Sequence, residues 1–202
     1  MEWKNKFHDA CCADELERMI RDEIKAGFLS DDEILEDCED HLEDDYPEEC
    51  DTLSEDDFLE IIEVFRSTYG NTGSQENFLK LDAAFDALTS RGIVALHYAG
   101  YTQSEGFEDC AEARADLEDE DIEVIGCCFY SEQDLGHILH EESTQLYLSF
   151  GACLDEPTSE EIGQIIVEEL QKAGFEVQWN QSADTKIAIQ NLTWDKYYTE
   201  CE

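Results

Sequence analysis

Sixteen of the 27 residues from Asp31 to Asp57 are aspartate or glutamate, and no lysine or arginine lies between Lys25 and Arg66. His41 is the one histidine in that interval, and an unperturbed histidine is mostly neutral at pH 7. A chain that carries so much self-repulsion is disordered, is kept strongly solvated for its own sake, or binds a cationic partner.

The acidic charge is laid over a regular apolar pattern, which favours a folded chain. The 202 residues carry a net charge of −41, yet 42% of them are hydrophobic and 10% are aromatic. Residues 1–72 hold 25 acidic and 6 basic side chains, a net charge of −19. Charge of this size accompanies disorder where apolar residues are scarce, which is not the case here. We therefore expect the acidic stretch to belong to a folded domain.

Three amphipathic helices are predicted in the first 72 residues. Apolar side chains recur at every fourth position from Leu16 to Phe28, which indicates the first helix. Ser30 and Glu33 form a capping-box pattern at the start of the second helix, and the pattern recurs at residues 54–57 for the third. Tyr46-Pro47 ends the second helix, because the residue before a proline disfavours the helical conformation. We define residues 1–72 as an acidic helical subdomain.

A glycine-containing linker, Tyr69–Ser74, separates this subdomain from a region of alternating strands and helices. Strands are predicted within residues 92–100, 122–131, 144–153, 175–179 and 186–190. Helices are predicted at residues 74–92, 105–117, 131–140 and 158–173. The last two strands are expected to form a hairpin. The order indicates an α+β fold, with an N-terminal segment of about three helices followed by a helix-covered sheet of about five strands, and residues 73–202 form the α+β domain.

Composition argues against several classes of protein. No stretch approaches the roughly 18–20 consecutive apolar residues of a membrane span, and the N-terminus lacks the apolar core of a signal peptide. We therefore expect a cytoplasmic protein without membrane contact. Direct nucleic-acid binding is rejected, because only 12 basic residues stand against 53 acidic ones. The nine cysteines contain no CxxC pair, which argues against a zinc ribbon or a thioredoxin-like motif.

Four segments of the second half serve as landmarks: GYTQSEG (100–106), FYSEQDL (129–135), LYLSFGA (146–152) and AGFEVQW (173–179). With these segments, the sequence resembles a family of uncharacterised bacterial proteins, a domain of unknown function. IRDEIKAGFLSDDEILE (20–36) is similar to the leading helical part of that family. The resemblance implies a bacterial origin and one shared architecture. It leaves the activity open, since none of the landmarks is a known catalytic signature.

Two segments of the second half could form a small-ligand or metal site. GYTQSEG follows a predicted strand where a helix begins, so its amides could hold an anion. The candidate residues of this loop are Tyr101, Thr102, Ser104, Glu105 and Gly106. The alternative interpretation is a plain strand-to-helix turn whose glycines serve the backbone shape. His137 and His140 share one helix face and are weak metal candidates, because only one helix contributes. We predict no metal, no cofactor and no catalytic residue.

The acidic stretch itself is the strongest candidate site. Its predicted contact residues are Asp37, Glu39, Asp40, Glu43, Asp44, Asp45, Tyr46, Asp56 and Asp57. Closely spaced carboxylates repel one another, and a cationic partner relieves this repulsion and associates faster. Adaptation to salt is the alternative explanation for the acidity. The uneven placement of the charge and the nine cysteines argue against it.

We therefore expect a non-enzymatic, acidic protein that binds a basic protein. The leading hypothesis is an immunity protein of the antitoxin type, which neutralises a basic toxin or effector in the cytosol by occluding its cationic site. One alternative is a DNA-mimic regulator that sequesters a nucleic-acid-binding protein. Another is a small-ligand or metal-binding module, or an enzyme, at the loop and histidines above. The sequence leaves the oligomeric state open.

Overall fold

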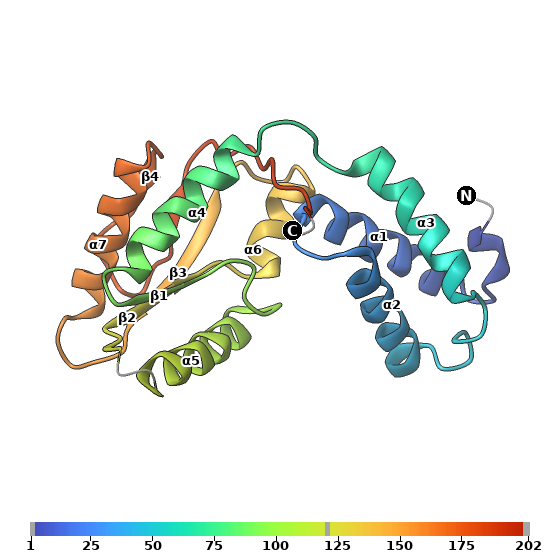
Figure 1. Ribbon diagram of the computed structural model, residues 1–202, viewed down its shortest axis with the longest axis horizontal. Coiled ribbons are helices and arrows are strands. Elements are labelled where there is room, and N and C mark those ends of the chain that lie inside the picture. The colour runs from blue at the N-terminus through green and yellow to red at the C-terminus, as the bar shows by residue number, and fades with distance from the viewer. Residues whose placement is uncertain (1–2, 120–121, 200–202) are drawn as a thin grey trace. The chain divides into compact units, whose positions relative to one another are not determined.

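The computed structural model describes residues 3–119 and 122–199, which form two compact units (Figure 1). Unit 1 extends to Gln75 and includes the C-terminal segment from Asp195 onward, whereas unit 2 runs from Glu76 to Trp194. The sequence pattern predicts a boundary between residues 72 and 73, with the C-terminal segment in the second domain. In the structure the boundary follows Gln75, and the C-terminal segment packs with the helical unit.

Unit 1 is helical. Its elements are the 3-10 helix η1 (Trp3–Lys6) and the α-helices α1 (Ala10–Ala26), α2 (Asp31–Asp45) and α3 (Glu55–Tyr69). One apolar cluster joins the inward faces of the three α-helices, and its completely buried members include Leu16, Ile34 and Ile62. Burial of each such side chain contributes about 1.5–3 kcal/mol. No helix in the described part of the chain is long and apolar enough to cross a membrane.

Local sequence signals set the ends of these helices. The Glu33 amide donates to Ser30 Oγ at 3.2 Å, and the Ser30 amide donates to Glu33 Oε2 at 2.7 Å, which completes a capping box. The same reciprocal bonds start α3 at Ser54 and Asp57. Helix α2 ends one residue before Tyr46-Pro47. The predicted capping boxes and the predicted end of the second helix are confirmed.

Unit 2 is a mixed sheet with helices. Its elements are α4 (Glu76–Thr89), β1 (Ile93–Leu96), α5 (Gln103–Asp119), β2 (Gly126–Phe129), α6 (Glu132–Leu139), β3 (Leu146–Ala152), α7 (Ser159–Lys172), β4 (Val177–Gln178) and β5 (Ile187–Ile189). The strand order is β1-β2-β3-β5-β4; β1 and β2 are parallel and the other neighbours are antiparallel. Across the described residues, seven α-helices and a five-stranded sheet confirm the α+β fold.

Helices cover both faces of the sheet around β2 (Figure 1). On one face α4 and α7 contact each other, and Ile162 of α7 lies over Gly126. On the other face the ring of Phe129 meets Phe107 of α5 edge to face, with centroids 4.9 Å apart. Cys127 belongs to the apolar cluster on the α5 side. Because side chains alternate along a strand, Cys128 points to the opposite face.

Residues 195–199 have neither helix nor strand and belong to unit 1. Asn71 Nδ2 donates to the carbonyl oxygen of Lys196 at 2.9 Å, and the amide of Tyr197 donates to Gln75 Oε1 at 2.9 Å. Gly27 adopts a φ of +75°, and a Cβ added there would lie 2.7 Å from the Cα of Tyr197. These contacts fix the end of α1 and the segment after α3 to the C-terminal segment.

Candidate protein-docking surface

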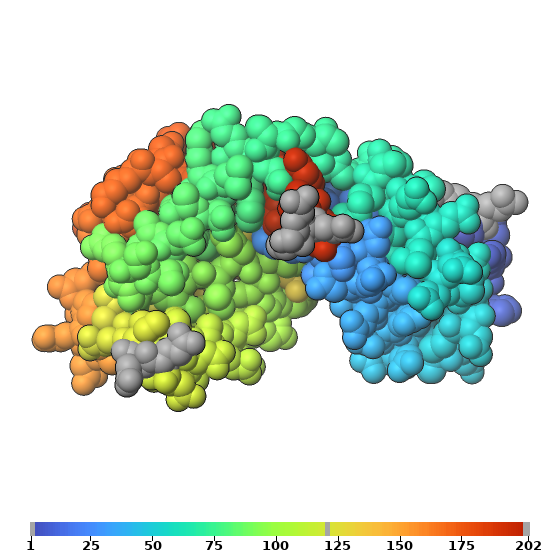
Figure 2. Space-filling model, viewed as in Figure 1, coloured from blue at the N-terminus to red at the C-terminus, as the bar shows by residue number. Residues whose placement is uncertain are grey.

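The outward side of α2 carries a set of exposed carboxylates. Helix α2 itself lies in the light blue part of the space-filling view in Figure 2. This α2 acidic face comprises the exposed residues Asp32, Glu36, Asp37, Glu39, Asp40, Glu43 and Asp44. The opposite side of the helix buries Ile34, Leu35, Cys38 and Leu42 in the core of unit 1. No ion pair joins the α2 acidic face to a cationic side chain of the described residues. The face is therefore anchored by packing and left unneutralised.

The electrostatics of this face oppose the stability of its own helix. Glu36 and Asp40, and again Asp40 and Asp44, are four residues apart, where like charges repel on a helix. Partial desolvation, and then the carboxylates of Asp40 and Glu36, raise the pKa of Asp37. The last turn of α2 has acidic side chains and no basic one, although the helix dipole places partial negative charge at that end.

Two of the predicted contact residues at the end of α2 are engaged within unit 1. The carboxylate Oδ2 of Asp45 lies 3.2 Å from His41 Nδ1. The hydroxyl of Tyr46 donates to Glu15 Oε2 at 3.0 Å, and this hydrogen bond raises the pKa of Tyr46 to about 12. Tyr46 thus ties the end of α2 to α1, and its ring is half-buried.

Asp57 is also engaged. Its Oδ1 lies 2.9 Å from Lys6 Nζ, and its Oδ2 accepts the amide of Ser54. The hydrogen bond from Lys6, with those from Ser54, lowers the pKa of Asp57 to about 2. The predicted contact residues that are exposed and have no ion pair in the described part of the chain are Asp37, Glu39, Asp40, Glu43, Asp44 and Asp56.

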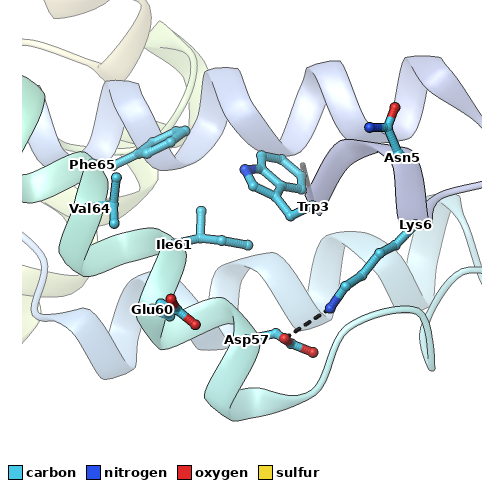
Figure 3. A pocket seen from close by; sticks show the side chains of 8 residues that line it. All are labelled: Trp3, Asn5, Lys6, Asp57, Glu60, Ile61, Val64 and Phe65. Atoms are coloured by element: carbon cyan, nitrogen blue, oxygen red, sulfur yellow. Dashed lines mark hydrogen bonds and ion pairs between the residues drawn. The ribbon is translucent and has the colours of Figure 1, made fainter. Parts of the chain in front are cut away.

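An apolar pocket of about 600 Å³ lies between η1 and α3. It is lined by Trp3, Asn5, Lys6, Asp57, Glu60, Ile61, Val64 and Phe65. Figure 3 shows Trp3 and Ile61 on facing sides of this space, with Val64 and Phe65 on the next turn of α3 and Lys6 reaching Asp57. Trp3 Nε1 is buried and has no hydrogen-bond acceptor among the described residues.

No pattern in the sequence indicates this pocket. Ile61 and Phe65 belong to the buried apolar stripe of α3. Periodicity along one helix does not reveal the space that a distant N-terminal segment leaves beside it. A usable signal is Val64, an apolar residue next to Glu63 and outside the apolar stripe, whose side chain is 50% exposed. Contiguous apolar surface with a polar rim is typical of an interaction site, whereas a single exposed apolar residue is common, so Val64 becomes informative only beside the apolar walls of the pocket.

The five loop candidates of unit 2 are brought together in the turn that starts α5. The amide of Thr102 donates to Glu105 Oε2 at 2.8 Å, and the amide of Glu105 donates to Thr102 Oγ1 at 3.4 Å. The Glu105 carboxylate thus already accepts the Thr102 amide, which a bound anion at the start of α5 would otherwise accept. Gly106 is buried against β2, whereas Tyr101 and Ser104 are exposed.

The two histidine candidates lie at the end of α6 and are exposed. His137 Nδ1 is 2.9 Å from Glu142 Oε2. His140 is the C-cap residue, and its amide donates to the carbonyl oxygen of Gly136 at 2.9 Å. Within residues 3–119 and 122–199, no three His, Cys, Asp or Glu side chains converge in a way that could hold a metal ion.

Comparison with known families decides the assignment of the chain. The family described as Domain of unknown function (DUF6891) matches residues 9–198. The chain belongs to this family. The match spans α1 to α3 of unit 1 and the whole sheet of unit 2, so both units are parts of one DUF6891 domain. No curated protein and no solved structure matches the chain.

The four landmark segments form strands of this DUF6891 sheet or the junctions beside them. GYTQSEG joins β1 to α5, and FYSEQDL joins β2 to α6. LYLSFGA forms β3, and AGFEVQW leads into β4. All four lie in unit 2, whereas the acidic face and the apolar pocket lie in unit 1. The resemblance to a family of unknown function is confirmed, and it assigns no activity to either unit.

Proposed function

We propose that this DUF6891 protein binds a basic protein through the α2 acidic face, and that it acts as an immunity protein. It would neutralise a toxin or effector by covering the cationic surface on which the toxin depends. The observation that carries the proposal is the set of exposed carboxylates on a well-packed helix, without counter-cations in the described chain and extending into the last turn. The carboxylates of the α2 acidic face destabilise their own helix, and a function in binding explains why the chain keeps them.

The physical advantage of such a face lies in rate and selectivity. A dense anionic surface attracts a cationic partner over about a Debye length and can raise the association rate by orders of magnitude. Desolvation is the main reason that the pKa of Asp37 is raised, and the repulsion from Asp40 and Glu36, which raises it further, is relieved by a cationic partner. The carboxylates lie on a helix whose other side is packed in the core. Binding a partner therefore costs little backbone conformational entropy. Exposed ion pairs contribute only about 0–1 kcal/mol each, so affinity depends on many of them acting together.

The experiment co-expresses this protein with the product of the gene adjacent to its own and measures growth and complex formation. We expect the protein to restore growth and to form a stoichiometric complex. Changing Asp37, Asp40, Glu43 and Asp44 to lysine should weaken binding about tenfold or more at low salt and abolish the rescue. Wild-type affinity should fall as salt rises from about 0.05 to about 0.5 M, mainly through the association rate.

A matched control separates a docking face from general acidity. Helix α5 carries four exposed acidic residues, Glu108, Glu112, Asp116 and Asp119, and changing them to lysine alters the net charge by the same amount. This variant should keep most of the affinity and the rescue. If the two variants lose binding equally, the acidity acts through net charge alone and the α2 acidic face is not the docking site.

A further inference from the structure

The pocket between η1 and α3 combines apolar walls with an acidic rim (Figure 3). Ile61 and Phe65 are 7% and 1% exposed, so the floor is part of the packed core, while Val64 stands 50% exposed at the edge. The walls therefore offer apolar surface at fixed positions. A preformed concavity of this kind accepts one large side chain with little reorganisation.

The charge around the pocket selects the kind of partner. The lysines of η1 are matched within the chain, since Lys4 pairs with Asp14 and Lys6 pairs with Asp57. On α3, Glu60 lines the pocket and is exposed, and neither it nor the neighbouring Glu63 has an ion pair in the described part of the chain. The rim is thus anionic, and it favours cations beside an apolar group.

We infer that this pocket receives one large apolar side chain of the basic partner, from a segment in which lysine or arginine flanks that side chain. The inference rests on the proposed function and names the anchor that the acidic face lacks. The Lys6–Asp57 pair, at 2.9 Å, shows that an ammonium group reaches a carboxylate of the pocket while its own segment packs against α3. Trp3 lines the pocket, and its buried Nε1–H has no acceptor among the described residues, so the signal of this group reports on changes at that wall.

Two synthetic peptides of about 14 residues test this inference. One carries leucine at the i, i+3, i+4 and i+7 spacing of an amphipathic helix and lysine elsewhere, and the other has serine in place of every leucine, so that both carry the same charge. Binding is measured by titration calorimetry at about 50 mM salt. We expect the Lys/Leu peptide to bind the wild-type protein about tenfold or more tightly than the Lys/Ser peptide, because only the former can fill the pocket.

Two variants locate the effect. Val64→Asn replaces an apolar wall by an amide at an exposed helix position and should bring the affinities of the two peptides to within about twofold of each other. Leu79→Asn is the matched control, because Leu79 is likewise exposed (54%) on a helix but lies in unit 2. It should leave both affinities unchanged. In nitrogen–proton spectra, the Trp3 Nε1–H signal should shift on addition of the Lys/Leu peptide. That of Trp179, which donates to the Ser182 carbonyl oxygen at 3.1 Å, should not.

The outcomes separate this inference from the proposed function. If neither peptide binds at low salt, the acidic surface does not attract basic segments and both proposals fall. If both bind equally, acidic docking stands and the pocket inference is overturned. It is also overturned if Val64→Asn keeps the preference for the Lys/Leu peptide, or if the Trp3 signal stays in place at saturation, because the leucines then bind elsewhere.

Discussion

The backbone of Gly106 lies directly against the ring of Phe129. A Cβ added at Gly106 would lie 2.6 Å from Phe129 Cδ2 and 2.7 Å from the carbonyl oxygen of Ala99. Phe129 is completely buried, and Phe107 meets it edge to face, so the ring has no free space into which to move. Glycine at this position is therefore what lets α5 approach the sheet closely.

We predict that Gly106→Ala destabilises unit 2 by about 1–3 kcal/mol, because the added methyl group overpacks the contact between α5 and β2. The matched control is Gly136→Ala in the interior of α6, where an added Cβ meets nothing within 4 Å. That change should stabilise the protein by up to about 1 kcal/mol through helix propensity. Urea unfolding of the two variants measures both effects, and equal stabilities would contradict the packing argument.

Asp134 and Lys186 form an ion pair at the start of α6. Lys186 Nζ lies 2.8 Å from both carboxylate oxygens of Asp134, whose side chain is 9% exposed. Lys186→Met leaves that carboxylate buried without its counter-charge, and we expect a loss of about 1–3 kcal/mol in the free energy of unfolding.

The control for this prediction is Lys80→Met. Lys80 also pairs with a carboxylate, Glu76, at 2.7 Å, but the two side chains are 46% and 69% exposed. An exposed pair of this kind contributes little, so the variant should remain within about 0.5 kcal/mol of the wild type. Similar losses in the two lysine variants would show that the burial of Asp134 is not the cause.

Local signals predicted most of the fold. The capping boxes at Ser30 and Ser54 and the stop before Tyr46-Pro47 depend on residues within one or two turns of each other, and the structure contains all of them. The order of strands and helices also follows from local periodicity. The α2 acidic face could be read from the sequence for the same reason, since one helix supplies every carboxylate in it.

Contacts between distant segments could not be predicted. The pocket requires η1 and α3, which are more than 50 residues apart, and the C-terminal segment reaches unit 1 without any periodic pattern. Cys127 is a further example. A hydrogen bond from Cys110 lowers the pKa of Cys127 against the effect of burial. The sequence does not reveal that α5 brings a second thiol to that face.

Glu49 joins the segment after α2 to the start of α1. Its Oε1 accepts the amides of His8 and Asp9, both at 2.9 Å, and its Oε2 accepts the hydroxyl of Thr52 at 2.8 Å. Burial alone would raise the pKa of Glu49, but the hydrogen bonds from Thr52, Asp9 and His8 outweigh it and lower the pKa below the ordinary value of 4.5. The folded state therefore releases this proton more readily than the unfolded chain does.

This shift predicts a specific pH dependence. A carboxyl group whose pKa is lowered by folding contributes stability that is complete above its unfolded pKa and is lost as the pH falls through its folded pKa. The difference in unfolding free energy between the wild type and Glu49→Gln should thus be largest above about pH 5 and should shrink as the pH is lowered below 4.5.

Glu48→Gln, at an exposed neighbouring position, corrects for the loss of one negative charge and should differ little from the wild type at any pH. Urea unfolding of the three proteins from pH 7 to about pH 3 measures this difference. The difference in unfolding free energy between the wild type and Glu49→Gln should not stay constant or widen as the pH falls. Such a result would show that the amide bonds to Glu49 do not stabilise its charged form.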